Sequence, residues 1–275
     1  MIQKIKFITL IDLLFMFILA ISGSIKNEVL SDTVYYLAFV IPVFAGISYI
    51  ISQREKLSER RSDIARSLLR DFTVNKRDAL LSLPVIFVGI GAVLLISLAT
   101  SFLMELAGFE NTASFDEPFL LSLLIHAFVP ALLEELLFRF IPVNLLRDEP
   151  KTAILITSIF FSFAHANLFQ IPYAFAAGVI FSSLYIASGS ILPCILMHFL
   201  NNALSLTSIY GYGSSALWIT FASLVAASLV FIAIRAKAYI APAKKLTSGS
   251  KIELGYSPLL LIAVSLTFAI SALFA

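Results

Sequence analysis

The chain consists of a succession of apolar runs separated by short polar stretches. A run of roughly 17 to 25 residues is long enough to cross a bilayer as a helix. By this measure the sequence predicts eight or nine membrane-spanning helices, and therefore an all-α, polytopic transmembrane helical bundle. Their approximate ranges are 5–22, 34–51, 79–107, 118–146, 152–169, 171–188, 191–208, 215–236 and 258–275.

Two of these runs, 79–107 and 118–146, are longer than a bilayer requires. A span of that length must tilt, kink or project beyond the hydrocarbon layer. Proline disrupts the hydrogen bonding of a helix, so Pro84, Pro130 and Pro142 are the expected kink points.

Composition excludes a soluble protein. Hydrophobic residues make up 60% of the 275 residues, charged residues 13%, and the mean hydropathy is +0.97. An ordinary soluble domain has about 25% charged residues. This apolar composition predicts membrane lipid as the surroundings of the protein. The small net charge of +2 indicates no nucleic-acid partner. The single cysteine, Cys194, excludes an internal disulfide and a cysteine-based zinc cluster.

The longest polar segment, 53–78, separates the second and third spans. It can form a short amphipathic helix on the membrane surface, or it can be a solvated loop. In the helical interpretation its apolar side comprises Leu57, Ile64, Leu68 and Leu69.

The distribution of Lys and Arg residues along the chain predicts the orientation of the protein in the membrane. If segment 53–78 is cytoplasmic, alternation of the spans places every one of the 19 Lys and Arg residues except Lys26 on that side. This agrees with the positive-inside rule. We therefore expect one integral membrane domain, 1–275, in the cell membrane, with a cytoplasmic N-terminus.

Ionisable residues interrupt the fourth apolar run at Glu134, Glu135 and Arg139. A charge at membrane depth costs at least a few kcal/mol, so these groups need partners or a function. Glu135 and Arg139 are four residues apart and suit an ion pair within one helix. Glu134 points about 100° away from Glu135, which leaves its carboxylate available for another role.

Candidate partners lie in two later spans. Glu134 and His165 are nearly equally distant from the turn 147–151, so antiparallel neighbouring helices would bring them to a similar depth. His165 shares a helical stripe with Ser158 and Ser162, and His198 shares another with Asn202 and Ser205. Such stripes are expected to face the bundle interior, because lipid does not solvate them.

This set of residues supports hydrolysis. A buried glutamate near an imidazole can activate a water molecule as a general base, and amide or imidazole N–H groups can stabilise the resulting oxyanion. A zinc site formed by Glu134, His165 and His198 is the nearest alternative, although no H-E-x-x-H pattern is present. A purely structural polar network and a transporter are further alternatives.

Three motifs resemble the CPBP intramembrane protease family, also called the CAAX prenyl protease 2 or Abi family. They are E-E-x-x-x-R at 134–139, F-x-x-x-H at 161–165 and H-x-x-x-N at 198–202. The resemblance covers about 118–208, which is the expected catalytic core.

The resemblance implies an intramembrane endopeptidase without a cofactor that acts on a membrane-associated or lipidated peptide or protein. It implies that Glu134 and His165 activate the water, that His198 and Asn202 form the oxyanion hole, and that Glu135 and Arg139 support the site. Some members of the family are thought to be non-proteolytic scaffolds, and others act in bacteriocin self-immunity, so both roles remain alternatives.

Overall fold

The computed structural model describes residues 1–109, 115–247, 252 and 254–273 of the chain. Within these residues every regular element is helical, which confirms the expected fold class. The α-helices are α1 (Ile2–Gly23), α2 (Glu28–Glu55), α3 (Arg61–Arg70), α4 (Lys76–Leu106), α5 (Phe119–Ser122), α6 (Val129–Glu135), α7 (Ile141–Leu145), α8 (Pro150–Ala164), α9 (Ile171–Ser188), α10 (Leu192–Ile209), α11 (Ser215–Ile234), α12 (Ala236–Thr247) and α13 (Ser257–Leu273).

The helices match the apolar runs. Seven helical segments are long and apolar enough to cross a membrane, and Pro150–Ala164 and Ser257–Thr267 are shorter apolar helices. These correspond one to one with the nine ranges predicted from the sequence. The fourth of the seven is the composite segment Phe119–Leu145, which runs from α5 to α7.

Local sequence signals set several helix ends. The side-chain oxygens of Asn27 and Asn75 accept the backbone N–H groups of Leu30 and Asp78, each at 2.9 Å, and so cap the N-termini of α2 and α4. Helix α9 ends at Gly189, whose φ of +71° is in the left-handed region that glycine adopts without a steric cost.

Two π-helical segments divide the composite fourth span. They are η1 (Leu123–Phe128) and η2 (Leu136–Phe140), and α6 lies between them. Each ends two residues before a proline, Pro130 or Pro142, that the sequence marked as a kink point. Proline has no N–H to donate and its ring clashes with the carbonyl four residues earlier, so a local change in hydrogen-bond register is expected there. Pro84 lies inside the continuous helix α4.

The polar segment 53–78 contains a helix, α3, as one of the two interpretations predicted. Ile64 and Leu68 are buried, as expected for its apolar side. Leu57 and Leu69, in contrast, are exposed, so their expected place on that side is wrong. Leu57 precedes the helix, and Leu69 follows Leu68 around the helix by about 100°.

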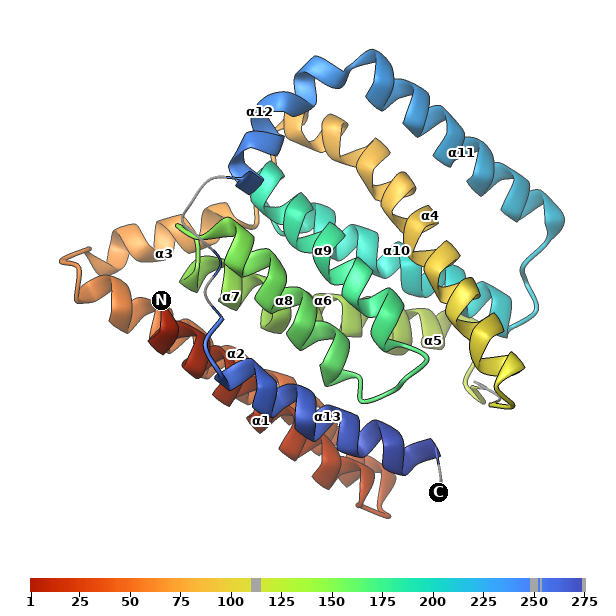
Figure 1. Cartoon of the computed structure of the whole chain (residues 1–275), viewed down its shortest axis with the longest axis horizontal. Helices are drawn as coiled ribbons and strands as arrows, with labels where there is room; N and C mark the ends of the chain where they lie inside the picture. The colour runs from red at the N-terminus through yellow and green to blue at the C-terminus, as the bar shows by residue number, and fades with distance from the viewer. Residues whose placement is uncertain (110–114, 248–251, 253, 274–275) are drawn as a thin grey trace.

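The helices are arranged around a central group (Figure 1). Helices α1, α2 and α13 lie on one side and α4 and α11 on the other, with α5 to α10 between them. Helices α8 and α9 pack closely at Gly178, where a Cβ atom would lie 2.5 Å from the Cα atom of Ser158. Residues 134–202, which include the polar groups singled out in the sequence, run from α6 to α10 and so belong to this central group.

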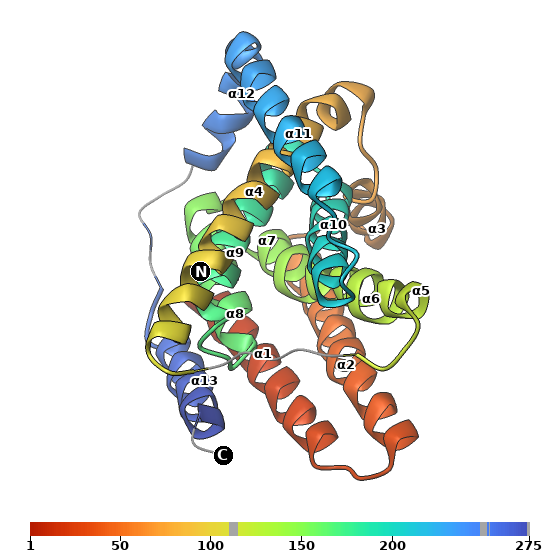
Figure 2. The same ribbon diagram turned by 90° about the vertical axis from the view of Figure 1, so that its right-hand side faces the viewer.

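The cation-rich helices gather at one end of the bundle. Helix α3 and helix α12, which carries Lys237, Lys244 and Lys245, lie at the upper left of Figure 1, whereas the α1–α2 connection and the C-terminal end of α4 lie at the opposite end. Figure 2 shows the same separation after a quarter turn, with α12 at the top and the α1–α2 connection at the bottom.

Asp71, at the C-terminus of α3, ties the elements of the basic end together. Its carboxylate accepts hydrogen bonds from Asn144 Nδ2 at 2.9 Å and from the hydroxyl of Tyr185. Its backbone carbonyl accepts hydrogen bonds from Ile191 N and Ser190 Oγ. One residue thereby connects α3 with α7, with α9 and with the start of α10.

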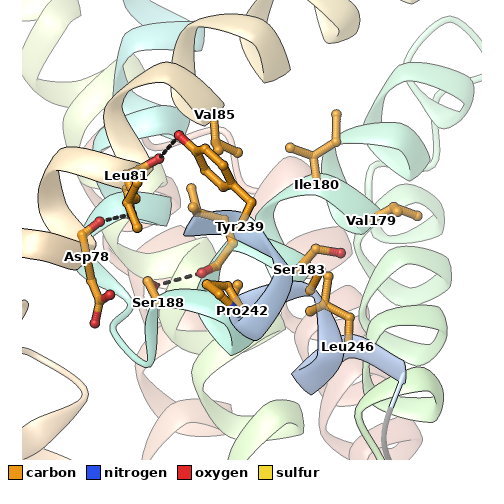
Figure 3. Close-up of a pocket in the computed structure, with 14 residues that line it drawn as sticks. Asp78, Leu81, Val85, Val179, Ile180, Ser183, Ser188, Tyr239, Pro242 and Leu246 are labelled. Carbon is orange, nitrogen blue, oxygen red and sulfur yellow. Dashed lines mark hydrogen bonds between the residues drawn. The ribbon is translucent and has the colours of Figure 1, made fainter. Parts of the chain in front are cut away.

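Helix α12 lies against α4 and α9 at the same end (Figure 3). The hydroxyl of Tyr239 donates a hydrogen bond of 3.1 Å to the carbonyl of Leu81. A largely apolar cavity of about 310 Å³ lies between these helices. None of the site residues expected from the sequence lines it.

We predict that Asp71→Ala lowers the free energy of unfolding by about 1–3 kcal/mol, because hydrogen bonds to a charged group are lost. The measurement is the thermal unfolding of the purified protein in detergent. Asp63→Ala is the control, since Asp63 makes only surface ion pairs with Arg60 and Arg66, worth about 0–1 kcal/mol. Equal destabilisation by the two substitutions would contradict the anchoring role of Asp71.

Candidate active site

A second cavity, of about 460 Å³, lies inside the central group of helices. Its walls come from α4, the composite fourth span, α8, α9 and α10, with one residue from α2. Glu134, His165, His198 and Asn202 all line it. The structure therefore brings together four polar residues that the sequence placed in three separate spans.

Glu134 faces this cavity from α6. Its side chain is 16% exposed, and its Oε2 atom lies 3.7 Å from Nε2 of His198. The next residue, Glu135, is fully buried and points away from the cavity wall. The two adjacent carboxylates thus have the separate environments expected from the turn of about 100° between successive helical residues.

Glu135 forms the expected ion pair with Arg139. Arg139 Nη1 donates to Glu135 Oε1 at 3.0 Å, and both side chains are completely buried. The guanidinium carbon lies 3.7 Å from the ring centroid of Phe161 and 5.1 Å from that of Phe181, within the range of cation–π attraction. These contacts offset part of the free-energy cost of burying the guanidinium, whose Nε and Nη2 atoms have no hydrogen-bond partner among the described residues.

The same carboxylate oxygen fixes His198, a contact that the sequence did not reveal. Glu135 Oε1 lies 2.8 Å from His198 Nδ1. A carboxylate paired with arginine can only accept, so His198 Nδ1 carries the hydrogen. The rings of Phe161 and Phe181 lie 5.7 and 5.4 Å from the imidazole and hold it from two sides. Nε2 is then the ring nitrogen directed toward Glu134.

His165 is fixed by its own helix. It follows the last residue of α8, and its Nδ1 atom lies 2.6 Å from the backbone carbonyl of Phe161. Since a carbonyl only accepts, Nδ1 is again the protonated nitrogen, and in a neutral ring Nε2 is left with a lone pair. His165 therefore offers a hydrogen-bond acceptor in the cavity that Glu134 also lines.

Asn202 lines the cavity one helical turn beyond His198 on α10. Its Oδ1 atom accepts a hydrogen bond of 3.5 Å from Asn201 Nδ2. This contact orients the amide, because the oxygen is directed toward Asn201 and the NH2 group is the remaining donor.

Other cavity residues were not identified from the sequence. Tyr35, Tyr173 and Asn201 line the cavity. His126 also lines it, although its lack of a polar companion at helical spacing favours a structural or supporting role from the sequence alone. The tyrosines stand alone in apolar runs and gave no signal, whereas the adjacent asparagine pair at 201–202 could have drawn attention to Asn201. His126 also stacks on Phe115, with ring centroids 4.3 Å apart.

The serine stripe on α8 is buried, as expected, but it does not reach the cavity. Ser158 and Ser162 instead donate to the carbonyls of Ile154 and Ile159 of their own helix, at 2.6 and 2.9 Å. Ser205, on the α10 stripe, does line the cavity.

We predict that Glu135→Leu destabilises the protein by about 3–5 kcal/mol, because it leaves the Arg139 charge buried without its partner. The double variant Glu135→Leu/Arg139→Met is expected to recover most of that loss, as measured by thermal unfolding in detergent. A double variant no more stable than the single one would contradict an ion pair of this kind.

Within the described residues, no three His, Cys, Asp or Glu side chains come close enough together to form a metal-binding group.

The comparison with protein families gives one result: residues 116–204 match the family described as type II CAAX prenyl endopeptidase Rce1-like. No curated protein and no solved structure matches the chain. The family match covers about a third of the chain and includes Glu134, His165, His198 and Asn202. It confirms the resemblance based on the three motifs, because residues 116–204 are similar to the type II CAAX prenyl endopeptidase Rce1-like family.

Proposed function

We propose that the protein is an intramembrane endopeptidase that hydrolyses a peptide bond with a water molecule activated by Glu134. The observation that carries the proposal is the convergence of Glu134, His165 and His198 on one cavity inside the helical bundle. The family match over 116–204 supports the reaction class, because the matched family is one of endopeptidases.

In this mechanism Glu134 and His165 hold the water molecule between them. His165 Nε2 accepts one hydrogen of the water, and the Glu134 carboxylate accepts the other. Glu134 removes a proton as the water oxygen attacks the carbonyl carbon of the substrate, forming a tetrahedral oxyanion. When the C–N bond breaks, Glu134 returns that proton to the leaving amine, so it acts first as base and then as acid.

His198 and Asn202 are the proposed donors to the oxyanion. Asn202 can donate from its amide NH2 group. His198 already uses Nδ1–H for Glu135, so it donates from Nε2 only when the ring carries both hydrogens. The carboxylates of Glu134 and Glu135 lie 3.7 and 2.8 Å from the two ring nitrogens. Glu135 is then a positioning residue that keeps the donor of His198 directed toward the cavity.

We further propose that the N-terminus and segment 53–78 are cytoplasmic. The support is the clustering of cations on α3 and α12 at one end of the bundle, together with the positive-inside rule.

We predict that Glu134→Gln lowers kcat by about 10²–10⁴-fold, the usual contribution of a general base. The measurement is cleavage of a membrane-associated peptide by purified protein. The substrate for this assay is identified by comparing the proteins of membranes that carry the wild type with those of membranes that carry Glu134→Gln. Glu105→Gln is the control, because Glu105 is exposed on α4 and does not line the cavity.

Three outcomes of this experiment separate the alternatives. Unchanged cleavage by Glu134→Gln would refute the glutamate mechanism. Loss of wild-type cleavage in a chelator, restored by zinc, would favour a metal bound by Glu134, His165 and His198. If no peptide is cleaved and Glu134→Gln retains the biological activity of the wild type, a scaffold or immunity role is favoured.

We predict that Asn202→Ala lowers kcat by about 10²–10³-fold with little change in KM, because an oxyanion donor acts mainly on the transition state. Ser208→Ala is the matched control, since Ser208 is exposed on the same helix and does not line the cavity. A change confined to KM would instead assign Asn202 to substrate binding.

A further inference from the structure

We infer that the active-site cavity opens on the membrane face opposite the basic loops, so that the substrate is presented from the non-cytoplasmic side. The inference rests on the proposed function and its orientation, and it adds the side of access and the class of substrate. It is carried by the position of the cavity mouth, by the exposure of its lining residues and by the charges at the two ends of the bundle.

The lining residues that lie in connections between helices all belong to one end of the bundle. They are Phe115, which lies between α4 and α5, and His165, Phe169 and Gln170, which lie between α8 and α9. Ile209, the last residue of α10, also lines the cavity. These connections lie at the end away from α3 and α12 (Figures 1 and 2).

The exposed fraction of the cavity-lining side chains rises toward that same end of the bundle. Along α10, His198 is 5% exposed, Asn202 is half-buried, and Ser205 and Ile209 are exposed. Along α8, Phe161 is buried and His165 is half-buried. Toward the basic end the fully buried side chains of Arg139, Phe181 and Cys194 lie beneath the site. The cavity is therefore a pocket closed toward α3 and α12 and open toward the other membrane face.

The charges assign these two ends to the two sides of the membrane. Helices α3, α4 and α12 supply the basic end with Arg and Lys residues. The open end has Asp116 and Glu117 just before α5, and the sequence from 107 to 118 contains no Lys or Arg. By the positive-inside rule, the open end faces away from the cytoplasm.

The lining also favours a particular class of substrate. Among the described residues, no lysine or arginine lines the cavity, so no cation is placed to bind a terminal carboxylate. The wall instead offers aromatic side chains, including Tyr35 and Tyr173, and the neutral amides of Gln170 and Asn201. An internal, uncharged stretch of a secreted or membrane-anchored polypeptide fits this surface. A lipidated tail presented from the cytoplasm would meet the closed end of the cavity.

The test is the labelling of single cysteines with a membrane-impermeant maleimide, in the full-length protein in sealed vesicles of known orientation. Native Cys194 is fully buried and provides a low background. Ser205→Cys reports on the mouth of the cavity, and Ser62→Cys, on the exposed face of α3, reports on the basic end. Each variant is also labelled after denaturation to give the total.

We expect Ser205→Cys to react in right-side-out vesicles and to lose its labelling in inside-out vesicles, with the opposite result for Ser62→Cys. Reaction of both cysteines from the same side, reaction of Ser205→Cys from the cytoplasmic side, or its failure to react from either side would overturn the inference. Labelling does not require turnover, so it is independent of the Glu134→Gln experiment. A failure of the labelling test therefore leaves the proposed hydrolysis intact, and the converse also holds.

Discussion

The site depends on the hydrogen bonds made by one buried carboxylate, that of Glu135. One oxygen of this group accepts hydrogen bonds from Arg139, within the composite fourth span, and from His198, on α10. A buried charge without partners is costly, so the packing of the fourth span against α10 is constrained to a rotation that brings these three groups together. The rings of Phe161 and Phe181, from α8 and α9, complete the enclosure. Four helices are thus held in register around a single ion pair.

This constraint allows two adjacent glutamates to have different roles. Glu135 is held inside the protein by its contacts with Arg139 and His198, whereas Glu134, one residue earlier, reaches the cavity. A buried neighbour that is paired with Arg139 and His198 keeps the Glu134 carboxylate directed into the cavity without occupying its oxygens. The arrangement explains why two acids and a base in one apolar span are compatible with a stable helix, despite the cost of each charge in a membrane.

Much of this structure was predictable from the sequence, because long apolar runs and an i, i+4 ion pair depend on local periodicity. The apolar helical segments, predicted as eight or nine spans, and the Glu135–Arg139 pair followed from such local patterns. The motif spacing also identified Glu134, His165, His198 and Asn202. The His198–Glu135 contact and the lining by Tyr35 and Tyr173 depend on how helices rotate against one another, which no local pattern encodes. The buried side of α3 was predicted only in part, because Leu57 lies before the helix begins.

The π-helical segments on either side of α6 have a consequence for how this region can vary. Each has hydrogen bonds that span five residues, so it holds one residue more than an α-helical turn would. A π-helical segment absorbs its extra residue without turning the helix that follows, so deleting one residue from η1 or η2 would restore the α-helical register and leave the flanking faces nearly unchanged. Helix α6 has no extra residue to lose, so a deletion there would rotate the helix beyond it by about 100°. Single-residue deletions are therefore expected to be far more damaging in α6, which carries Glu134, than in η1 or η2.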